Sequence, residues 1–219
     1  MRKYNRVVIV ANGSIIQPEF YTPIFQDSFI ISVDGGIRHL EKIGIMPDLM
    51  IGDFDSINPE TLERYKALGI NIKEFPRDKD YTDTELALFE ASHISSSAIL
   101  LGAFGNRADH TFANVYLLYE ARELGIDMEI VDKYHTIFLV NEGEKRKIPG
   151  DIGDIVSIIP ILPSSSITTY GLKYPLKEEE INFGHARGMS NIKIDEDAWV
   201  FLKKGTLLIF VVKKEVEKV

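Results

Sequence analysis

Short apolar runs alternate with helical patterns through the first 132 residues of this chain. The runs are mostly unbroken by polar residues, which is typical of strands buried on both faces of a parallel sheet. The apolar runs are Val7–Ala11, Phe29–Val33, Leu49–Ile51, Ile70–Lys73, Ala98–Gly102 and Met128–Val131. This alternation predicts an open, mostly parallel α/β sheet over residues 1–132.

The helical patterns between these runs carry recognisable start signals. Asn58-Pro59 combines a capping residue with proline at the first helical position. Thr82-Asp83-Thr84-Glu85 has the spacing of a capping box, in which a threonine and a glutamate satisfy the first backbone N–H groups. Both signals favour short helices that connect one predicted strand to the next.

The pattern changes after about residue 133. Short β-rich runs are now separated by turn signals, and no long helical pattern lies between them. The runs are Asp154–Ile161, Ile192–Ile194, Ala198–Leu202 and Leu207–Val212. Residues 133–219 are therefore expected to form a second, all-β domain, an antiparallel β-sandwich. The predicted fold class is α/β plus all-β.

Composition excludes several classes of protein. The 219 residues carry 25 basic and 33 acidic side chains, a formal net charge of −8 without the basic field of a nucleic-acid binder. The absence of cysteine excludes disulfides and thiol catalysis. No stretch approaches the roughly 20 apolar residues of a membrane span, and the first apolar run is too short for a signal peptide. We expect a cytoplasmic protein that binds neither nucleic acid nor membranes.

Acidic residues follow four of the predicted strands at the same end. The loops concerned are Asp34-Gly35-Gly36, Asp53-Phe54-Asp55, the segment 78–83 and Arg107-Ala108-Asp109. The loops at the carboxyl ends of parallel strands share one edge of a sheet, so we expect these four to converge on one crevice. Clustered carboxylates repel one another, and a hard divalent cation such as Mg²⁺ is the natural counter-charge.

Each of these loops also has a plainer interpretation. Asp-x-Asp pairs are common in solvated turns, acidic residues suit a helix N-terminus, and Arg107 with Asp109 makes an ordinary surface pair. Their common position at one end of the predicted strands favours a site. The planar fork of Arg107 suits phosphate oxygens, with Lys79 and Arg38 as weaker candidates.

The first loop, Asn12-Gly13-Ser14, allows two readings. In one interpretation its backbone N–H groups bind a phosphate of a ligand, and in the other the loop is a plain turn. The sequence contains neither GxxxxGK[ST] nor GxGxxG, so neither a P-loop nor a dinucleotide fingerprint is present.

An ordered set of motifs resembles the thiamine pyrophosphokinase family. The strings that carry the resemblance are Asp34–Gly36, Pro47–Ser56, Asp78–Glu85, Gly102–His110, Tyr170–Leu176 and Gly188–Asn191. They occur in the family's order and cover nearly the whole chain. The resemblance implies an α/β domain that binds ATP and Mg²⁺ and a β-sandwich that contributes to thiamine binding and to a homodimer. It also implies transfer of the pyrophosphoryl group of ATP to the hydroxyl of thiamine, which gives thiamine diphosphate and AMP.

The resemblance also implies roles for individual residues by position. It makes Asp53, Asp55 and Asp83 the Mg²⁺ ligands. It implies contacts with nucleotide or phosphates for Asp34, Gly35, Asp80, Thr82, Arg107 and Asp109, and contacts with thiamine for Ser190 and Asn191. The catalytic set is Asp55, Asp83, Arg107 and Asp109.

Some assignments stay open at this stage. Asp83 and Asp109 are both candidates for the proton acceptor. Residues 15–26 match no motif, and Trp199 does not align with the aromatic residue that often stacks on thiamine in the family, so we expect it in a strand.

Three alternative functions also remain at this stage. One is a haloacid-dehalogenase-like phosphatase built on Leu49–Asp55, which Gly52 and Ile57 disfavour. The second is a pyrophosphokinase that acts on a pterin or another small alcohol. The third is a non-catalytic sensor of nucleotide or thiamine.

Overall fold

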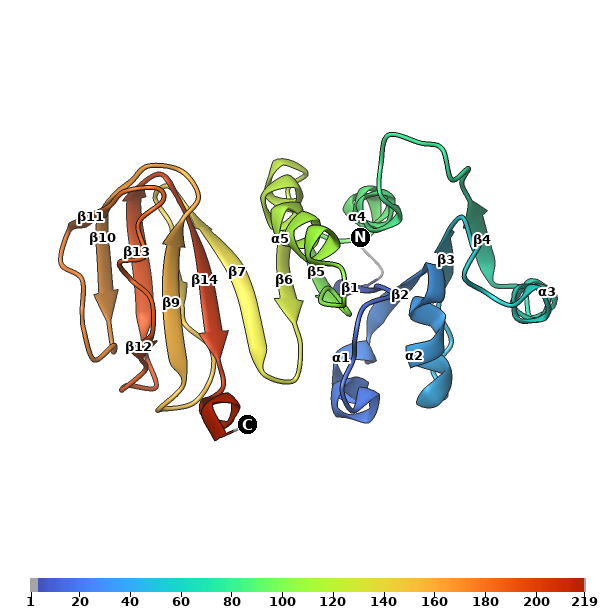
Figure 1. Cartoon of the computed structure of the whole chain (residues 1–219), viewed down its shortest axis with the longest axis horizontal. Coiled ribbons are helices and arrows are strands. Elements are labelled where there is room, and N and C mark those ends of the chain that lie inside the picture. Colours follow the sequence, from blue (N-terminus) through green and yellow to red (C-terminus); the bar gives the residue numbers. More distant parts are fainter. Residues whose placement is uncertain (1–3, 219) are drawn as a thin grey trace. The chain divides into compact units, whose positions relative to one another are not determined.

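The computed structural model describes residues 4–218, and the chain divides into two compact units, residues 1–133 and 134–219. Figure 1 shows the first unit in blue to green and the second in yellow to red. Among the described residues, no helix is both long enough and apolar enough to span a bilayer.

The first unit is built on a parallel sheet in the strand order β6-β5-β1-β2-β3-β4. Its strands are β1 (Arg6–Val10), β2 (Ser28–Val33), β3 (Leu49–Gly52), β4 (Asn71–Glu74), β5 (Ser97–Leu101) and β6 (Asp127–Val131). All six lie on the apolar runs of the sequence, so the predicted parallel α/β sheet is confirmed. Because β1 pairs with both β2 and β5, the strand order reverses beside it. Such a switch point opens a crevice at the carboxyl ends of the strands.

Helices connect these strands. They are η1 (Pro18–Tyr21), α1 (Thr22–Phe25), η2 (Asp34–Gly36), α2 (Ile37–Lys42), α3 (Pro59–Ala67), α4 (Asp83–Ile94) and α5 (Ala108–Glu123). Both predicted caps are present. The side chain of Asn58 accepts a hydrogen bond from Glu60 N at 3.0 Å. Thr82 and Glu85 complete a capping box, each side chain accepting from the other's backbone N–H at 3.2 Å.

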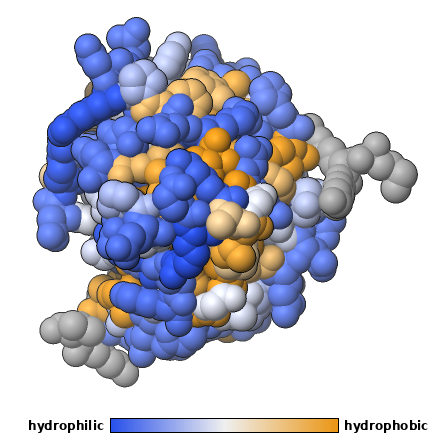
Figure 2. All heavy atoms as spheres, turned by 90° about the vertical axis from the view of Figure 1, so that its right-hand side faces the viewer, coloured by the Kyte–Doolittle hydropathy of each residue, from blue (hydrophilic) through white to orange (hydrophobic). Residues whose placement is uncertain are grey.

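The core of the first unit surrounds its central strand, in which Val7 to Val10 are completely buried. The segment 15–26, which matched no motif, contributes the buried rings of Tyr21 and Phe25 to this core. The segment therefore stabilises the unit by burying apolar surface. Figure 2 shows one face of the molecule, where hydrophilic side chains predominate and hydrophobic ones are visible between them.

The second unit contains two antiparallel sheets, in the orders β12-β9-β14-β7 and β11-β10-β13-β8. Its elements are β7 (His135–Asn141), β8 (Lys145–Lys147), β9 (Ile155–Pro160), β10 (Ser164–Tyr170), β11 (Glu179–Ile181), β12 (Asn191–Ile192), β13 (Trp199–Lys204), β14 (Thr206–Val212) and η3 (Lys214–Lys218). Residues from both sheets form one buried apolar cluster, so the predicted β-sandwich is confirmed.

Trp199 is a strand residue, as expected. It begins β13, and its ring stacks on that of Tyr170 with 6.0 Å between ring centroids and 16° between ring planes. The Lys145 ammonium lies 3.9 Å from the centroid of the Trp199 ring, a cation–π contact. These contacts place the indole in the β10-β13-β8 sheet, where it stabilises neighbouring strands.

Candidate active-site cleft

The loops at the carboxyl ends of the parallel strands enclose a cleft of about 580 Å³ in the first unit. Each loop contributes polar side chains to it. They include Asn12 after β1, Asp34 after β2, Asp53 and Asp55 after β3, Arg77 between β4 and α4, Asp83 at the start of α4, and Arg107 after β5. Thr82, Asp80 and Asp109 are not among the lining residues.

Asp34, one of the aspartates that line the cleft, has an unusual backbone conformation. Its φ of +44° lies in the left-handed region, and its Oδ1 accepts a hydrogen bond from Phe54 N at 3.4 Å. The carboxyl group lies directly over Gly52, where a Cβ atom would stand only 1.7 Å from Asp34 Oδ1. Gly52 is therefore required for Asp34 to reach the cleft.

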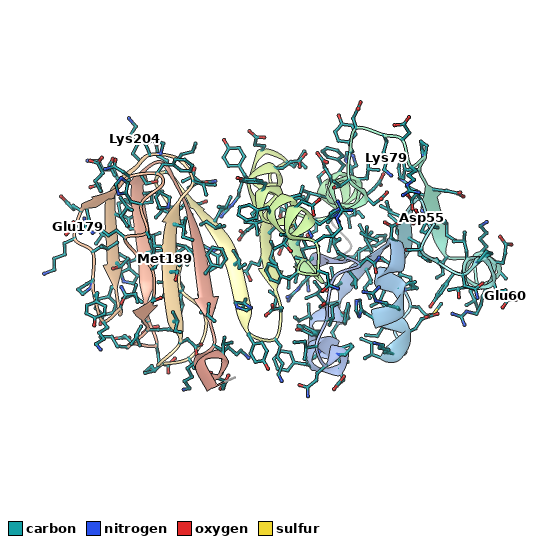
Figure 3. The ribbon with its side chains drawn as sticks, in the orientation of Figure 1. Asp55, Glu60, Lys79, Glu179, Met189 and Lys204 are labelled. Carbon is teal, nitrogen blue, oxygen red and sulfur yellow. The ribbon has the colours of Figure 1, made fainter. Side chains whose placement is uncertain are left out.

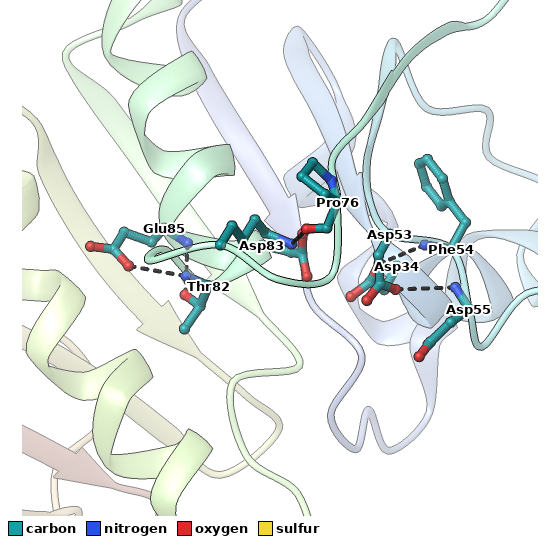
Figure 4. Close-up of polar contacts among 9 residues, drawn as sticks. Asp34, Asp53, Phe54, Asp55, Pro76, Thr82, Asp83 and Glu85 are labelled. Carbon is teal, nitrogen blue, oxygen red and sulfur yellow. Dashed lines mark hydrogen bonds and ion pairs between the residues drawn. The ribbon is translucent and has the colours of Figure 1, made fainter.

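Three carboxylates face one another in the cleft. Figure 4 shows Asp34 and Asp53 together, with Asp83 on the α4 side. Burial, and then the negative charge of Asp83, raise the pKa of Asp34 from 3.8 to about 7, and Asp53 adds to the rise. The hydrogen bond from Phe54 N acts in the opposite direction but does not offset them. Carboxylates that repel one another in this way favour positive counter-charge, and a hard divalent cation with oxygen ligands can supply it.

Cations of the protein already contact two of the carboxylates. Lys79 Nζ lies 2.8 Å from Asp83 Oδ1, and Arg77 Nη1 lies 3.5 Å from Asp55 Oδ2. Asp55 N also donates to Asp53 Oδ1 at 3.1 Å, which fixes the Asp-x-Asp turn. Within residues 4–218, no set of three or more acidic or histidine side chains already has a metal-binding arrangement. The ligands would therefore have to close around the ion.

Arg107 and Asp109 form a two-point ion pair across the rim. The Arg107 guanidinium donates to Asp109 Oδ1 at 3.2 Å and to Oδ2 at 2.5 Å. This pairing lowers the pKa of Asp109 to about 2 and raises the pKa of Arg107. Asp109 is consequently a poor proton acceptor while the pair is intact.

Two of the three backbone N–H groups of the first loop are used within the fold. Gly13 N donates to Gly102 O at 2.9 Å, and Ser14 N donates to Phe104 O at 2.6 Å. These hydrogen bonds hold the loop against the loop after β5 and favour its interpretation as a turn.

The side chain of Arg38 is hydrogen-bonded to this first loop. Its guanidinium donates to the side chain of Asn12, to Asn12 O at 2.6 Å and to Gly13 O at 3.1 Å. Buried His39 adds a contact of 2.8 Å from Nε2 to Gly13 O. Gly35 packs against the same loop, since a Cβ there would lie 2.5 Å from Asn12 Oδ1. These residues position one wall of the cleft.

The raised pKa of Asp34 predicts that folding stability depends on pH. The folded chain binds the Asp34 proton more tightly than the unfolded chain does, so stability falls as pH rises from about 4 to about 7. In metal-free buffer, the stability advantage of Asp34→Asn over the original should therefore be smaller at pH 4.5 than at pH 8, and should grow by about 1–3 kcal/mol between these two pH values. Urea unfolding at both pH values measures this; a difference that does not vary with pH would contradict it.

Both units of the chain match models of one protein family. Residues 22–130 match the family model "Thiamin pyrophosphokinase, catalytic domain", and residues 136–207 match "Thiamin pyrophosphokinase, vitamin B1 binding domain". The thiamine pyrophosphokinase of Bacillus subtilis (strain 168) is 32% identical over 181 residues, which cover 82% of this chain and 85% of that protein. The chain belongs to the thiamine pyrophosphokinase family.

Solved structures of the thiamine pyrophosphokinase family share the fold. The crystal structure of the enzyme from Bacillus subtilis superposes with a TM-score of 0.85 and 30% identity, over 95% of this chain and 99% of that one. The structure from Geobacillus thermodenitrificans gives a TM-score of 0.82 and 28% identity, over 94% and 97% of the two chains. The similarity therefore extends over both units.

The two residues expected at thiamine by resemblance to the family differ in their surroundings. Ser190 is exposed with φ +55°, and its N–H donates to Ser157 Oγ at 3.1 Å. Asn191 is only 7% exposed, and its amide bridges the backbone of Tyr174, accepting from N at 3.0 Å and donating to O at 2.7 Å. The amide of Asn191 thus closes a loop of the second unit.

The buried amide predicts a stability effect. Asn191→Ala removes both hydrogen bonds to the Tyr174 backbone, so the free energy of unfolding should fall by about 1–2 kcal/mol. Urea unfolding measures this, with the exposed Asn182→Ala as a matched control expected to change little. Unchanged stability together with a raised KM for thiamine would instead assign the amide to the substrate.

Sequence reasoning missed some residues of the cleft in this family member. Arg77 contacts Asp55. Its position directly before the acidic segment 78–83 is the sequence feature that could have identified it. Buried Asn114 on α5 donates to Ala103 O at 2.8 Å and so fixes the loop that carries Arg107. Nothing in the sequence distinguishes Asn114 from an ordinary helical residue, because its role depends on packing.

Proposed function

We propose that this chain catalyses Mg²⁺-dependent transfer of the pyrophosphoryl group of ATP to the hydroxyl of thiamine. The observation that carries the proposal is the convergence of Asp34, Asp53, Asp55, Asp83 and Arg107 on one cleft, in a chain of the thiamine pyrophosphokinase family. The acidic floor calls for a metal ion, and the arginine at the rim suits phosphate oxygens.

In this proposal Asp53, Asp55 and Asp83 hold the Mg²⁺. When bound, the ion neutralises negative charge along the triphosphate. Asp34 lies beside Asp83 and Asp53, and when it is ionised its negative charge adds to the attraction of the cleft for a divalent cation. Gly35 and Thr82 shape the adjoining nucleotide site through the backbone, and Asp80 contributes negative charge nearby.

The remaining chemistry needs positioning more than covalent help from the protein. Attack falls on the β-phosphorus, so AMP leaves. Arg107 lies 69% exposed at the rim and can turn from Asp109 toward phosphate oxygens to offset the charge that develops there. Asp109 has a lowered pKa, and Asp83 would be a metal ligand, so neither carboxylate is a strong base. We assign the chain's main contribution to orientation and charge.

The second unit contributes to thiamine binding in this proposal. Thiamine is a cation, which the acidic cleft attracts, and Ser190 is the exposed residue that we assign to its binding, with Asn191 shaping the loop beside it. We also propose that the protein is a homodimer and is located in the cytoplasm. The catalytic domain is residues 1–132, and residues 133–219 contribute to thiamine binding and to dimer formation.

One assay tests the function. Protein, ATP, thiamine and Mg²⁺ should give thiamine diphosphate and AMP in equal amounts, both resolved by chromatography. Release of inorganic phosphate without AMP would favour the phosphatase. Faster turnover of a pterin alcohol than of thiamine would favour the second alternative, and binding of both ligands without product would favour a sensor.

A further inference from the structure

Lys79 occupies an unusual place for a lysine on a connecting loop. Figure 3 shows it on the connection that leads from β4 to α4. Its side chain is only 13% exposed, although a loop lysine ordinarily extends its ammonium into water. Lys79 Nζ donates to Pro76 O at 3.1 Å and lies 2.8 Å from Asp83 Oδ1. A largely buried ammonium of this kind requires a counter-charge, and Asp83 provides it.

The contact between Lys79 and Asp83 pairs two opposite charges, but it does not have the geometry of a hydrogen bond. Asp83 Oδ1 is buried and accepts no hydrogen bond of acceptable geometry, so the 2.8 Å contact is an ion pair without a directed N–H. No donor therefore satisfies this buried oxygen with good hydrogen-bond geometry. A metal ion that coordinates a lone pair therefore fits this oxygen better than the ammonium does.

The other cation at the acidic group is held less firmly. The Arg77 side chain is 84% exposed, and its contact with Asp55 is 3.5 Å long. A solvated arginine at that distance moves away at little cost. Two basic side chains, Lys79 and Arg77, pair with carboxylates of the cleft. Of these two, Lys79 is the one whose removal should measurably change the affinity of the cleft for a cation.

We propose that Lys79 is the resident counter-cation of the acidic cleft and competes with the divalent cation for Asp83. The inference rests on the proposed function, which makes Asp83 a metal ligand. An ammonium and a divalent cation repel each other and do not share one carboxylate oxygen. Lys79 therefore weakens metal binding to the free protein. A triphosphate brings negative charge that offsets both cations, so the metal enters the cleft together with the nucleotide.

Metal binding in the absence of nucleotide tests this inference. Mn²⁺ affinity is measured by electron paramagnetic resonance and calorimetry at constant ionic strength. Lys79→Met should bind Mn²⁺ about tenfold more tightly than the original protein, because a competing charge is lost. Lys79→Arg keeps the charge and should retain the weak affinity. Lys73→Met removes a comparable ion pair, 2.6 Å long and with Glu90 outside the cleft, and should change nothing.

A double variant locates the effect. Adding Asp83→Asn to Lys79→Met should abolish the gain in Mn²⁺ affinity if Asp83 is the shared ligand. Unchanged or weaker affinity in Lys79→Met would overturn the inference, and weaker affinity would show that Lys79 merely holds Asp83 in place. Thermal unfolding in chelator checks that the variants fold, and Lys79→Gln replaces the methionine variant if that one does not.

The same samples separate this inference from the proposed function. If the original protein forms thiamine diphosphate and AMP but Lys79→Met binds Mn²⁺ no more tightly, the competition fails and the proposed function stands. If the original protein forms no product with ATP and thiamine, the proposed function fails. Tighter Mn²⁺ binding by Lys79→Met that is lost with Asp83→Asn would then still support competition at Asp83.

Discussion

Asp83→Asn is expected to lower turnover by about three orders of magnitude while the protein stays folded. The substitution keeps the size of the side chain and removes one negative ligand of the proposed metal site, so charge on the triphosphate is no longer balanced. Steady-state turnover with ATP, thiamine and saturating Mg²⁺ measures the loss. Asp55→Asn should behave in the same direction, because Asp55 lines the same cleft.

Asp83→Asn should cost some stability, because the largely buried Lys79 ammonium loses its counter-charge, but the start of the helix is kept. Asp83 is the first residue of α4, and the capping box of that helix is made by Thr82 and Glu85. Removing the charge of Asp83 also relieves one cause of the raised pKa of Asp34. The exposed Asp78→Asn in the same loop is the matched control and should leave turnover nearly unchanged. Near-normal turnover of Asp83→Asn at saturating Mg²⁺ would remove Asp83 from the metal site.

Gly52→Ala should have the second largest effect, a loss of activity of at least about 100-fold. A Cβ at this position would lie 1.7 Å from Asp34 Oδ1, so the carboxyl group of Asp34 must leave its place. Gly52 also has φ +155°, which side-chain-bearing residues rarely adopt. Activity and Mn²⁺ affinity should fall together, because the Asp34 carboxyl group would no longer lie beside Asp53 and Asp83.

A second glycine separates strain from steric conflict. Gly69 also has a positive φ, +78°, but a Cβ there meets nothing within 4 Å. Gly69→Ala should therefore cost stability through backbone strain, measured by urea unfolding, while turnover of the folded protein stays normal. Equal losses of turnover in both variants would show that strain, and not the displacement of Asp34, explains the Gly52 effect.

The first unit was predictable because its signals are local. The strand β1 is buried on both faces, and it appears in the sequence as the continuous apolar run Val7–Ala11. The caps at Asn58 and Thr82 mark the starts of helices between the strands. The strand β10 gave no such signal. Its sequence, Ser164 to Tyr170, is rich in serine and threonine, and it became a strand by pairing with β11 and β13.

The candidate site was predictable in outline and not in detail. Parallel strands bring their carboxyl-end loops to one edge, so Asp53, Asp83 and Arg107 were expected to converge. The central position of Asp34 depends on its left-handed backbone and on the absence of a side chain at Gly52, which no local pattern reveals. The pairing of Lys79 with Asp83 likewise depends on how the loop before α4 folds back.

The position of Mn²⁺ bound together with a non-hydrolysable ATP analogue is the most direct test of the acidic cleft as a metal–triphosphate site. Anomalous diffraction from crystals of this complex locates the ion without reference to activity. We expect one or more peaks between the carboxylates of Asp53, Asp55 and Asp83, with phosphate oxygens completing the coordination. A peak elsewhere, or triphosphate bound away from these aspartates, would contradict the assignment.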